Sequence, residues 1–265
     1  APDLLFTDQN HMGGFLLKAM SKDYDYACTN TYYGHPYYIE AKYRTPMFIR
    51  SDPPVANFGG DTVRSFDAGI FGKPLMISEW NYMTPNPYCS QGAFLVGAYG
   101  ALNDVGALCY FAFAHSSELI TKNRPAGGFD FANNPILSLA QRAAVSMYLR
   151  GDVKPATVSF PIALSTDYFR NGSKKYWNHG VWRYGKLGLV GRVGHLLSDK
   201  IGATKLPENA AAVFESEPAW KSVAFDVPKI DIFSKDLIGE SARLKLDKGK
   251  IDEQNGIYIS STGEL

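Results

Sequence analysis

The sequence predicts an α/β fold for the first part of this 265-residue chain. Short apolar runs alternate there with segments of helical periodicity, which is the pattern of parallel strands joined by helices. Four such units can be counted up to about residue 150, with apolar runs at residues 4–7, 26–30, 75–78 and 107–113. The run at 75–78 is continuous and follows Gly72-Lys73-Pro74, as is typical of a strand that is buried on both faces.

Helical periodicity predicts three helices between and after these runs, at about residues 14–21, 90–105 and 134–150. The last has the clearest amphipathic pattern, because its apolar residues recur at i, i+4 and i+7. The residues of this expected buried face are Ile136, Ala140, Ala143 and Met147, with Leu137, Ala144 and Tyr148 beside them.

The pattern changes beyond residue 152. Strand-like runs occur at residues 157–160, 162–164, 222–227 and 256–260, and the pairs Asn255-Gly256 and Thr262-Gly263 are turn signals. We therefore expect two domains, with residues 1–152 as an α/β domain and residues 153–265 as a β-rich accessory region.

Composition and charge exclude several classes of partner. The net charge of +1 provides no field that would attract nucleic acid or anionic lipid. No stretch reaches the roughly 18 apolar residues that a membrane span needs. Cys28, Cys89 and Cys109 lack the spacing of a metal site. We expect no nucleic-acid partner, no membrane partner, no metal and no other cofactor.

Polar side chains gather at the ends of the four apolar runs. They are Asp8, Asn10 and His11 after the first run, Asn30 and Tyr32 after the second, residues 78–81 after the third, and His115 after the fourth. Catalytic groups of a (β/α)8 barrel lie at the carboxyl ends of its strands. These side chains are therefore expected to form one site.

The segment Lys73-Pro74-Leu75-Met76-Ile77-Ser78-Glu79-Trp80-Asn81 resembles the seventh-strand segment of the clan A glycoside hydrolases, in which the Glu is the nucleophile. Residues 30–32 resemble the sixth strand, which lines the sugar site. Residues 110–115 resemble the eighth strand, where an aromatic residue often floors the subsite next to the scissile bond. The last five residues, 261–265, resemble the start of a β-sandwich module that follows such barrels in some large bacterial enzymes.

This resemblance covers about residues 1–150 and implies a (β/α)8 TIM barrel of which only strands 5–8 are present. It implies an extracellular or periplasmic retaining glycoside hydrolase that cleaves a β-linked poly- or oligosaccharide with Glu79 as the catalytic nucleophile. The substrate-binding residues that it implies are Asn10, Asn30, Tyr32, His35, Trp80, Asn81, Phe113 and His115.

One departure from the family pattern concerns the second catalytic carboxyl group. Retaining hydrolysis needs two carboxyl groups ~5–5.5 Å apart, and the acid/base Glu of this clan usually follows an Asn at the end of the fourth strand. No Asn-Glu pair occurs in a strand context here; Glu40 and Glu118 are the only local substitutes. We therefore expect an upstream half-barrel of the same polypeptide to supply the acid/base residue.

Other interpretations stay open. Glu79 could cap a turn or pair with an Arg, the histidines could be hydrogen-bonded loop residues, and Trp80 could pack in the core as well as stack on a sugar. The chain could also be a non-catalytic carbohydrate-binding or scaffold protein on a degenerate barrel. A metal-dependent hydrolase would use Asp8, His11, His35 and His115, but no HxH or HExxH spacing supports it.

Overall fold

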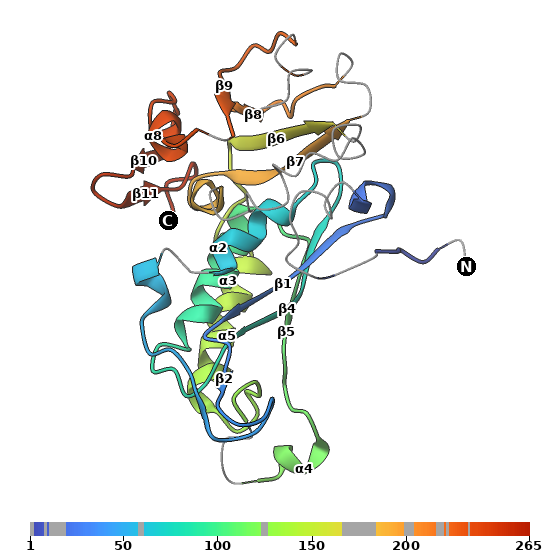
Figure 1. The fold of residues 1–265 in the computed structure, drawn as a ribbon, viewed down its shortest axis with the longest axis vertical. Coiled ribbons are helices and arrows are strands. Elements are labelled where there is room, and N and C mark those ends of the chain that lie inside the picture. The colour runs from blue at the N-terminus through green and yellow to red at the C-terminus, as the bar shows by residue number, and fades with distance from the viewer. Residues whose placement is uncertain are drawn as a thin grey trace.

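The computed structural model describes residues 3–7, 10, 20–57, 61–122, 127–165, 184–198, 204–215, 220, 223–232 and 234–265. They form two parallel sheets, one in each half of the chain, with helices between and beside them (Figure 1). Most of the helix expected at residues 14–21 lies outside the described residues, as do Asp8 and His11. None of the described helices is long and apolar enough to cross a bilayer.

The first sheet consists of β1 (Ala27–Tyr33), β4 (Leu75–Tyr82) and β5 (Ala107–Tyr110), in the order β1–β4–β5. Both pairings are parallel, so three of the four expected strands are confirmed. Two of them run further than expected because their β-branched and aromatic residues continue the ladder. The first apolar run, residues 4–7, was wrongly expected to be a strand: the Asp25 N–H donates to the Phe6 carbonyl, but the run joins no ladder.

One face of this sheet is covered by α3 (Gln91–Leu102) and α5 (Pro135–Tyr148), which lie side by side (Figure 1). Both helices were expected, and the Asn134 side chain caps α5 by accepting from the Leu137 N–H. The expected buried face of α5 was wrong by a small rotation, since Ile136 is 61% exposed. Ala140 is buried as expected, but Leu137 and Ala144 are buried with it in place of Ile136, Ala143 and Met147, because α5 packs closely against α3 along this stripe.

The second sheet contains β6 (Ser159–Ser165), β7 (Arg192–Ser198), β8 (Val213–Glu215) and β9 (Lys229–Asp231), in the order β7–β6–β8–β9. All its pairings are parallel, and every residue of β6 is buried. The strands expected within 157–164 and 256–260 are present, whereas the described residues of 222–227 form no strand. Parallel pairing buries both faces of a sheet, which accounts for the continuous apolar sequence of β6.

The remaining elements are short. They are the hairpins β2 (Tyr37–Tyr38) with β3 (Met47–Phe48) and β10 (Lys250–Asp252) with β11 (Ile257–Ile259), the helices α2 (Asp61–Ser65), α4 (Ser117–Ile120) and α8 (Leu237–Ala242), and the 3-10 turns η1 (Ser21–Asp23), η2 (Pro54–Asn57), η3 (Phe66–Ala68) and η6 (Gly185–Leu189).

Backbone hydrogen bonds join the two halves of the chain. The His195 N–H donates to the Gly69 carbonyl over 2.7 Å, and the Phe71 N–H donates to the His195 carbonyl over 2.8 Å. The buried Asn103 adds a side-chain link, because its Nδ2 donates to the Gly188 carbonyl. The second sheet is therefore fixed to the end of the first that lies away from the hairpin β2–β3 (Figure 1).

The contact between α3 and α5 predicts opposite effects for two identical substitutions. A Cβ at Gly97 would lie 2.7 Å from the Ala144 Cα, whereas a Cβ at Gly100 would meet only the flexible end of Leu108, at 3.0 Å. Gly97→Ala is expected to lower the free energy of unfolding by about 1–3 kcal/mol through overpacking. Gly100→Ala is expected to leave it unchanged or raise it by up to ~1 kcal/mol, because Ala favours helix.

Thermal and urea unfolding of both variants measure these differences. The close α3–α5 packing would be contradicted by a Gly97→Ala protein as stable as Gly100→Ala.

Candidate active site

An extra residue in β4 directs Glu79 to one side of the sheet. Ile77 packs in the core beneath the helices, and strict alternation along a strand would turn residue 79 to that same side. The register with β1 pairs Thr29 with Ile77 and then Asn30 with Glu79, which leaves Ser78 as an additional residue.

The other neighbour of β4 shows the same irregularity. On β4 the ladder advances from Ile77 to Trp80, while on β5 it advances only from Leu108 to Tyr110. Such a β-bulge re-aims the side chains that follow it. Glu79 consequently shares the face of Asn30, opposite the helices, and Trp80 returns to the helix side.

A short chain of hydrogen bonds holds this bulge. The Cys28 thiol donates to Ser78 Oγ over 3.2 Å, and Ser78 Oγ donates to Asn30 Oδ1 over 2.7 Å. Because the amide oxygen of Asn30 is used in this way, its Nδ2 group is the end that is presented to the cavity. The additional residue thus also orients a neighbouring side chain.

Glu79 interacts with Tyr32, the next residue outward on the same face of β1. Tyr32 Oη donates a hydrogen bond to Glu79 Oε2. Burial, followed by this hydrogen bond and the charge of Glu79, raises the pKa of Tyr32 well above its ordinary value. Tyr32 therefore remains a protonated donor throughout the physiological range. Within the described residues no Lys or Arg forms an ion pair with Glu79, so that alternative finds no support here.

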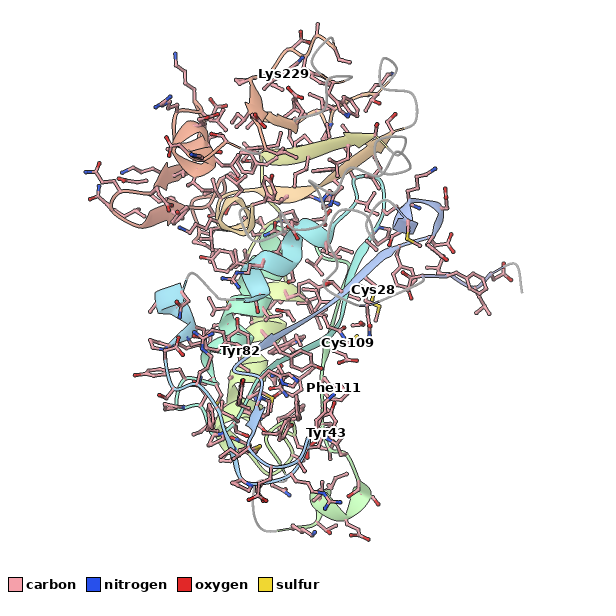
Figure 2. The ribbon with its side chains drawn as sticks, viewed as in Figure 1. Cys28, Tyr43, Tyr82, Cys109, Phe111 and Lys229 are labelled. Carbon is pink, nitrogen blue, oxygen red and sulfur yellow. The ribbon has the colours of Figure 1, made fainter. Side chains whose placement is uncertain are left out.

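Glu79 and Tyr32 line a cavity of about 890 Å³ at the carboxyl end of the first sheet. Its walls come from five places: Asn10, the ends of β1 and β4, the hairpin β2–β3 with its tip, the segment after β5, and the loop 127–130. The lining residues are Asn10, Asn30, Tyr32, His35, Pro36, Tyr38, Tyr43, Arg44, Thr45, Met47, Glu79, Met83, Phe111, His115, Gly127, Gly128, Phe129 and Asp130. Figure 2 shows Tyr43 and Phe111 at this end of the molecule, with Cys28 and Cys109 further back on the sheet.

The structure brings six of the nine expected site residues to this cavity, namely Asn10, Asn30, Tyr32, His35, Glu79 and His115. Glu40 and Glu118, the weak candidates for a general acid, are not among its lining residues.

Three expected residues lie elsewhere. Trp80 is buried in the core with its ring 4.7 Å from that of Tyr110, so it packs rather than stacks on a ligand. Phe113 is half exposed and packs edge-on against Phe131. Asn81 is fully buried and makes hydrogen bonds of its own.

Asn81 holds the cavity wall in place. Its Nδ2 donates to the carbonyl groups of Phe111 and Phe129, and its Oδ1 accepts from Tyr110 Oη over 3.0 Å. The backbone of Ala112 adds a further link, since its N–H donates to the Phe129 carbonyl over 2.8 Å. Asn81 is thus a positioning residue for two aromatic rings that face the cavity.

A histidine and a buried aspartate form one side of the cavity. His115 Nδ1 is hydrogen-bonded to Asp130 Oδ1, and the Asp130 side chain is 4% exposed while that of His115 is 49% exposed. The partner on Nδ1 leaves Nε2 of His115 for a ligand. Sequence reasoning missed Asp130, because its proximity to the strand ends depends on how the loop 127–130 folds back.

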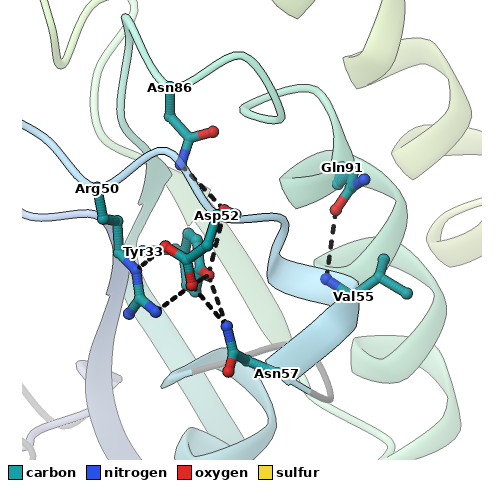
Figure 3. Close-up of polar contacts among 7 residues, drawn as sticks. All are labelled: Tyr33, Arg50, Asp52, Val55, Asn57, Asn86 and Gln91. Carbon is teal, nitrogen blue, oxygen red and sulfur yellow. Dashed lines mark hydrogen bonds and ion pairs between the residues drawn. The ribbon is translucent and has the colours of Figure 1, made fainter.

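A network at the base of the hairpin β2–β3 anchors it to the sheet (Figure 3). Arg50 and Asp52, on the segment that follows β3, form a bidentate ion pair, and the Arg50 guanidinium lies 4.4 Å from the Tyr33 ring centroid. Asp52 Oδ2 also accepts from Tyr33 Oη over 2.8 Å and from Asn57 Nδ2 over 2.7 Å. Since Tyr33 belongs to β1, this network fixes the hairpin next to Glu79.

Metal chemistry has no visible basis in the described part of the chain, where no three His, Cys, Asp or Glu side chains gather as a ligand set. His35 and His115 line the cavity, whereas Asp8 and His11 lie outside the described residues.

No family model, curated protein or solved structure matches this chain significantly. The geometry of the cavity therefore carries the functional inference.

The network around Asp52 predicts a pH-dependent contribution to stability. Hydrogen bonds from Arg50, and then from Tyr33, outweigh burial and hold the pKa of Asp52 well below its ordinary value. A depressed native pKa stabilises the fold above the unfolded-state pKa of ~4, and this contribution is lost as the pH falls below that value.

Asp52→Asn is expected to destabilise the protein by about 1 kcal/mol at pH 7, since an exposed pair is screened by solvent. The difference from the parent protein should shrink as the pH falls below about 4. Urea unfolding at several pH values checks this, and a difference that is constant from pH 7 to pH 3 would contradict it.

Proposed function

We propose that this chain carries the nucleophile site of a retaining glycoside hydrolase that acts on a β-linked poly- or oligosaccharide, with Glu79 as the nucleophile. One observation carries the proposal: a β-bulge turns Glu79 out of the core and into a cavity of about 890 Å³, where Tyr32 donates to its carboxylate. A volume of several hundred Å³ suits a ligand of one or more sugar rings.

The chemistry follows from what surrounds Glu79. One carboxylate oxygen attacks the anomeric carbon and forms a glycosyl ester while the bond to the leaving oxygen breaks; water then cleaves the ester. Tyr32 holds the attacking carboxylate in one rotamer. Asn30 presents Nδ2 as a donor and His115 presents Nε2 as an acceptor for ring hydroxyl groups, and Phe111 and Phe129 supply apolar faces.

The second carboxyl group is proposed to come from elements that complete the first sheet. Among the described lining residues only Glu79 and Asp130 have carboxyl groups, and Asp130 is engaged by His115. All four residues of β5 are half buried, so this edge strand can take a further neighbour. An adjoining half-barrel of the same polypeptide would place an acid opposite Glu79, as in a (β/α)8 barrel.

A site for polymeric glycans is proposed to act outside the cytoplasm, in the periplasm or the medium, where such substrates occur. A carbohydrate-binding protein without catalysis would use the same aromatic walls, and the experiment below separates the two.

The first test labels the nucleophile directly. Activated 2-deoxy-2-fluoro-β-glycosides carry a leaving group that needs no acid catalyst, and the fluorine slows hydrolysis of the glycosyl ester. Dinitrophenyl derivatives of glucose, mannose, xylose and galactose are expected to leave one of these sugars attached to Glu79. Mass spectrometry of the peptide that contains residues 74–82 measures the adduct.

The matched control is Glu79→Gln, which keeps shape and hydrogen-bonding size and is expected to form no adduct. A sugar attached to another residue, or equal labelling of both proteins, would rule out Glu79 as the nucleophile. Binding of the sugars without any adduct would favour the non-catalytic protein.

Removal of the Tyr32 donor tests the preorganisation of Glu79. Tyr32→Phe keeps the ring contacts but loses the hydrogen bond to Glu79, and it is expected to slow labelling about 10–100-fold through loss of one aligned donor. Unfolding curves should coincide with those of the parent protein within ~1 kcal/mol. A labelling rate that is unchanged would show that Tyr32 does not position the nucleophile.

A further inference from the structure

The tip of the hairpin β2–β3, residues 39–46, supplies three consecutive residues to the cavity wall. Tyr43, Arg44 and Thr45 all line it, although neighbours on an extended strand would alternate in direction. Tyr43 has a φ of +65°, which is the left-handed conformation. The Arg44 N–H donates to the Ala41 carbonyl over 3.1 Å and closes the turn.

A tyrosine is an unfavourable choice for this turn. Bulky side chains rarely adopt a positive φ, which Gly or Asn tolerates, and strain of this kind tends to occur at functional sites. Tyr43 is also 67% exposed, so its ring gains little from packing. The fold alone therefore does not account for an aromatic residue at this position.

The surroundings of Tyr43 hold its ring in place. The Tyr38 ring meets it at 5.4 Å in an edge arrangement, and Lys42 Nζ lies 4.9 Å from its centroid. Burial, and then the nearby Tyr43 hydroxyl, raise the pKa of Tyr38 above its ordinary value, and the same hydroxyl acts on Tyr32. Tyr43 lines the same cavity as Tyr32 and Glu79, while much of its ring stays open to solvent.

Arg44 adds unused hydrogen-bond donors beside this ring. Arg44 lines the cavity, and no carboxylate of the described residues forms an ion pair with its guanidinium. An aromatic face next to a planar set of donors matches the apolar face and the hydroxyl rim of a pyranose ring.

We propose that Tyr43 and Arg44 form a subsite for a second sugar unit, next to the unit attacked by Glu79, so that the substrate is an oligosaccharide and not a single glycoside. This inference rests on the proposed function and adds to it the residues that bind a second sugar unit. The hairpin is anchored by Arg50, Asp52 and Tyr33, which keeps the subsite at a fixed distance from the nucleophile.

Tyr37 provides a matched control on the same hairpin. It is 69% exposed, as large as Tyr43, and stacked on Phe48 with ring centroids 5.2 Å apart. It is not among the residues that line the cavity. A non-specific loss of exposed aromatic surface would therefore affect Tyr37→Ala and Tyr43 variants equally.

The experiment measures binding by calorimetry in full-length Glu79→Gln protein. The probes are the methyl β-glycosides and the β-1,4-linked hexasaccharides of glucose, mannose and xylose. Tyr43→Gly is expected to weaken binding of the preferred hexasaccharide about tenfold and to leave binding of the methyl glycoside unchanged. Tyr37→Ala should change neither, and Tyr43→Phe should retain most of the affinity.

Stability supplies an independent readout. A purely structural Tyr43 would make Tyr43→Gly less stable, whereas release of the left-handed strain predicts an equal or higher melting temperature. The second-sugar subsite is overturned if Tyr43→Gly binds the hexasaccharide normally, or if it loses the methyl glycoside equally. If no probe binds and no fluoro-glycoside labels Glu79, the proposed function itself fails.

Discussion

The site depends on one additional residue in β4. Without the bulge at Ser78, the regular alternation that buries Ile77 would also bury Glu79 among apolar side chains, where an unpaired carboxylate is costly. The bulge places Glu79 on the open face with Asn30, and the hydrogen bonds from Cys28 through Ser78 to Asn30 hold it there. Ser78 thus has two roles: its backbone forms the bulge, and its side chain hydrogen-bonds to Cys28 and Asn30.

The segments around Glu79 are held in place by side chains that do not line the cavity themselves. Asn81 ties together the segments that carry Phe111 and Phe129, and the ion pair of Arg50 with Asp52 fixes the hairpin to Tyr33. Such supporting contacts give a site the precision that side chains on loops lack by themselves. The same hairpin carries Tyr43 at its tip. One wall of the cavity therefore has an anchored base and a strained turn at its end.

The second parallel sheet lies away from the cavity and adds no described residue to it. It is joined to the first through His195 and Asn103, at the end of the molecule opposite the cavity. Its strand β6 is buried throughout, which makes this region a core of its own rather than an extension of the site. All the described residues that line the cavity belong to the first half of the chain.

Local patterns in the sequence determined the three strands of the first sheet, the helices α3 and α5, and six of the residues that line the cavity, because periodicity and strand-end placement depend on near neighbours. Tertiary structure alone decided the rest. Trp80 turns to the helix side because the bulge resets the alternation, Asn81 is withdrawn from the cavity by its hydrogen bonds to Phe111, Phe129 and Tyr110, and the buried stripe of α5 follows from its contact with α3. Asp130 and Tyr43 reach the cavity only because distant loops fold back over the strand ends, and no local pattern encodes that approach.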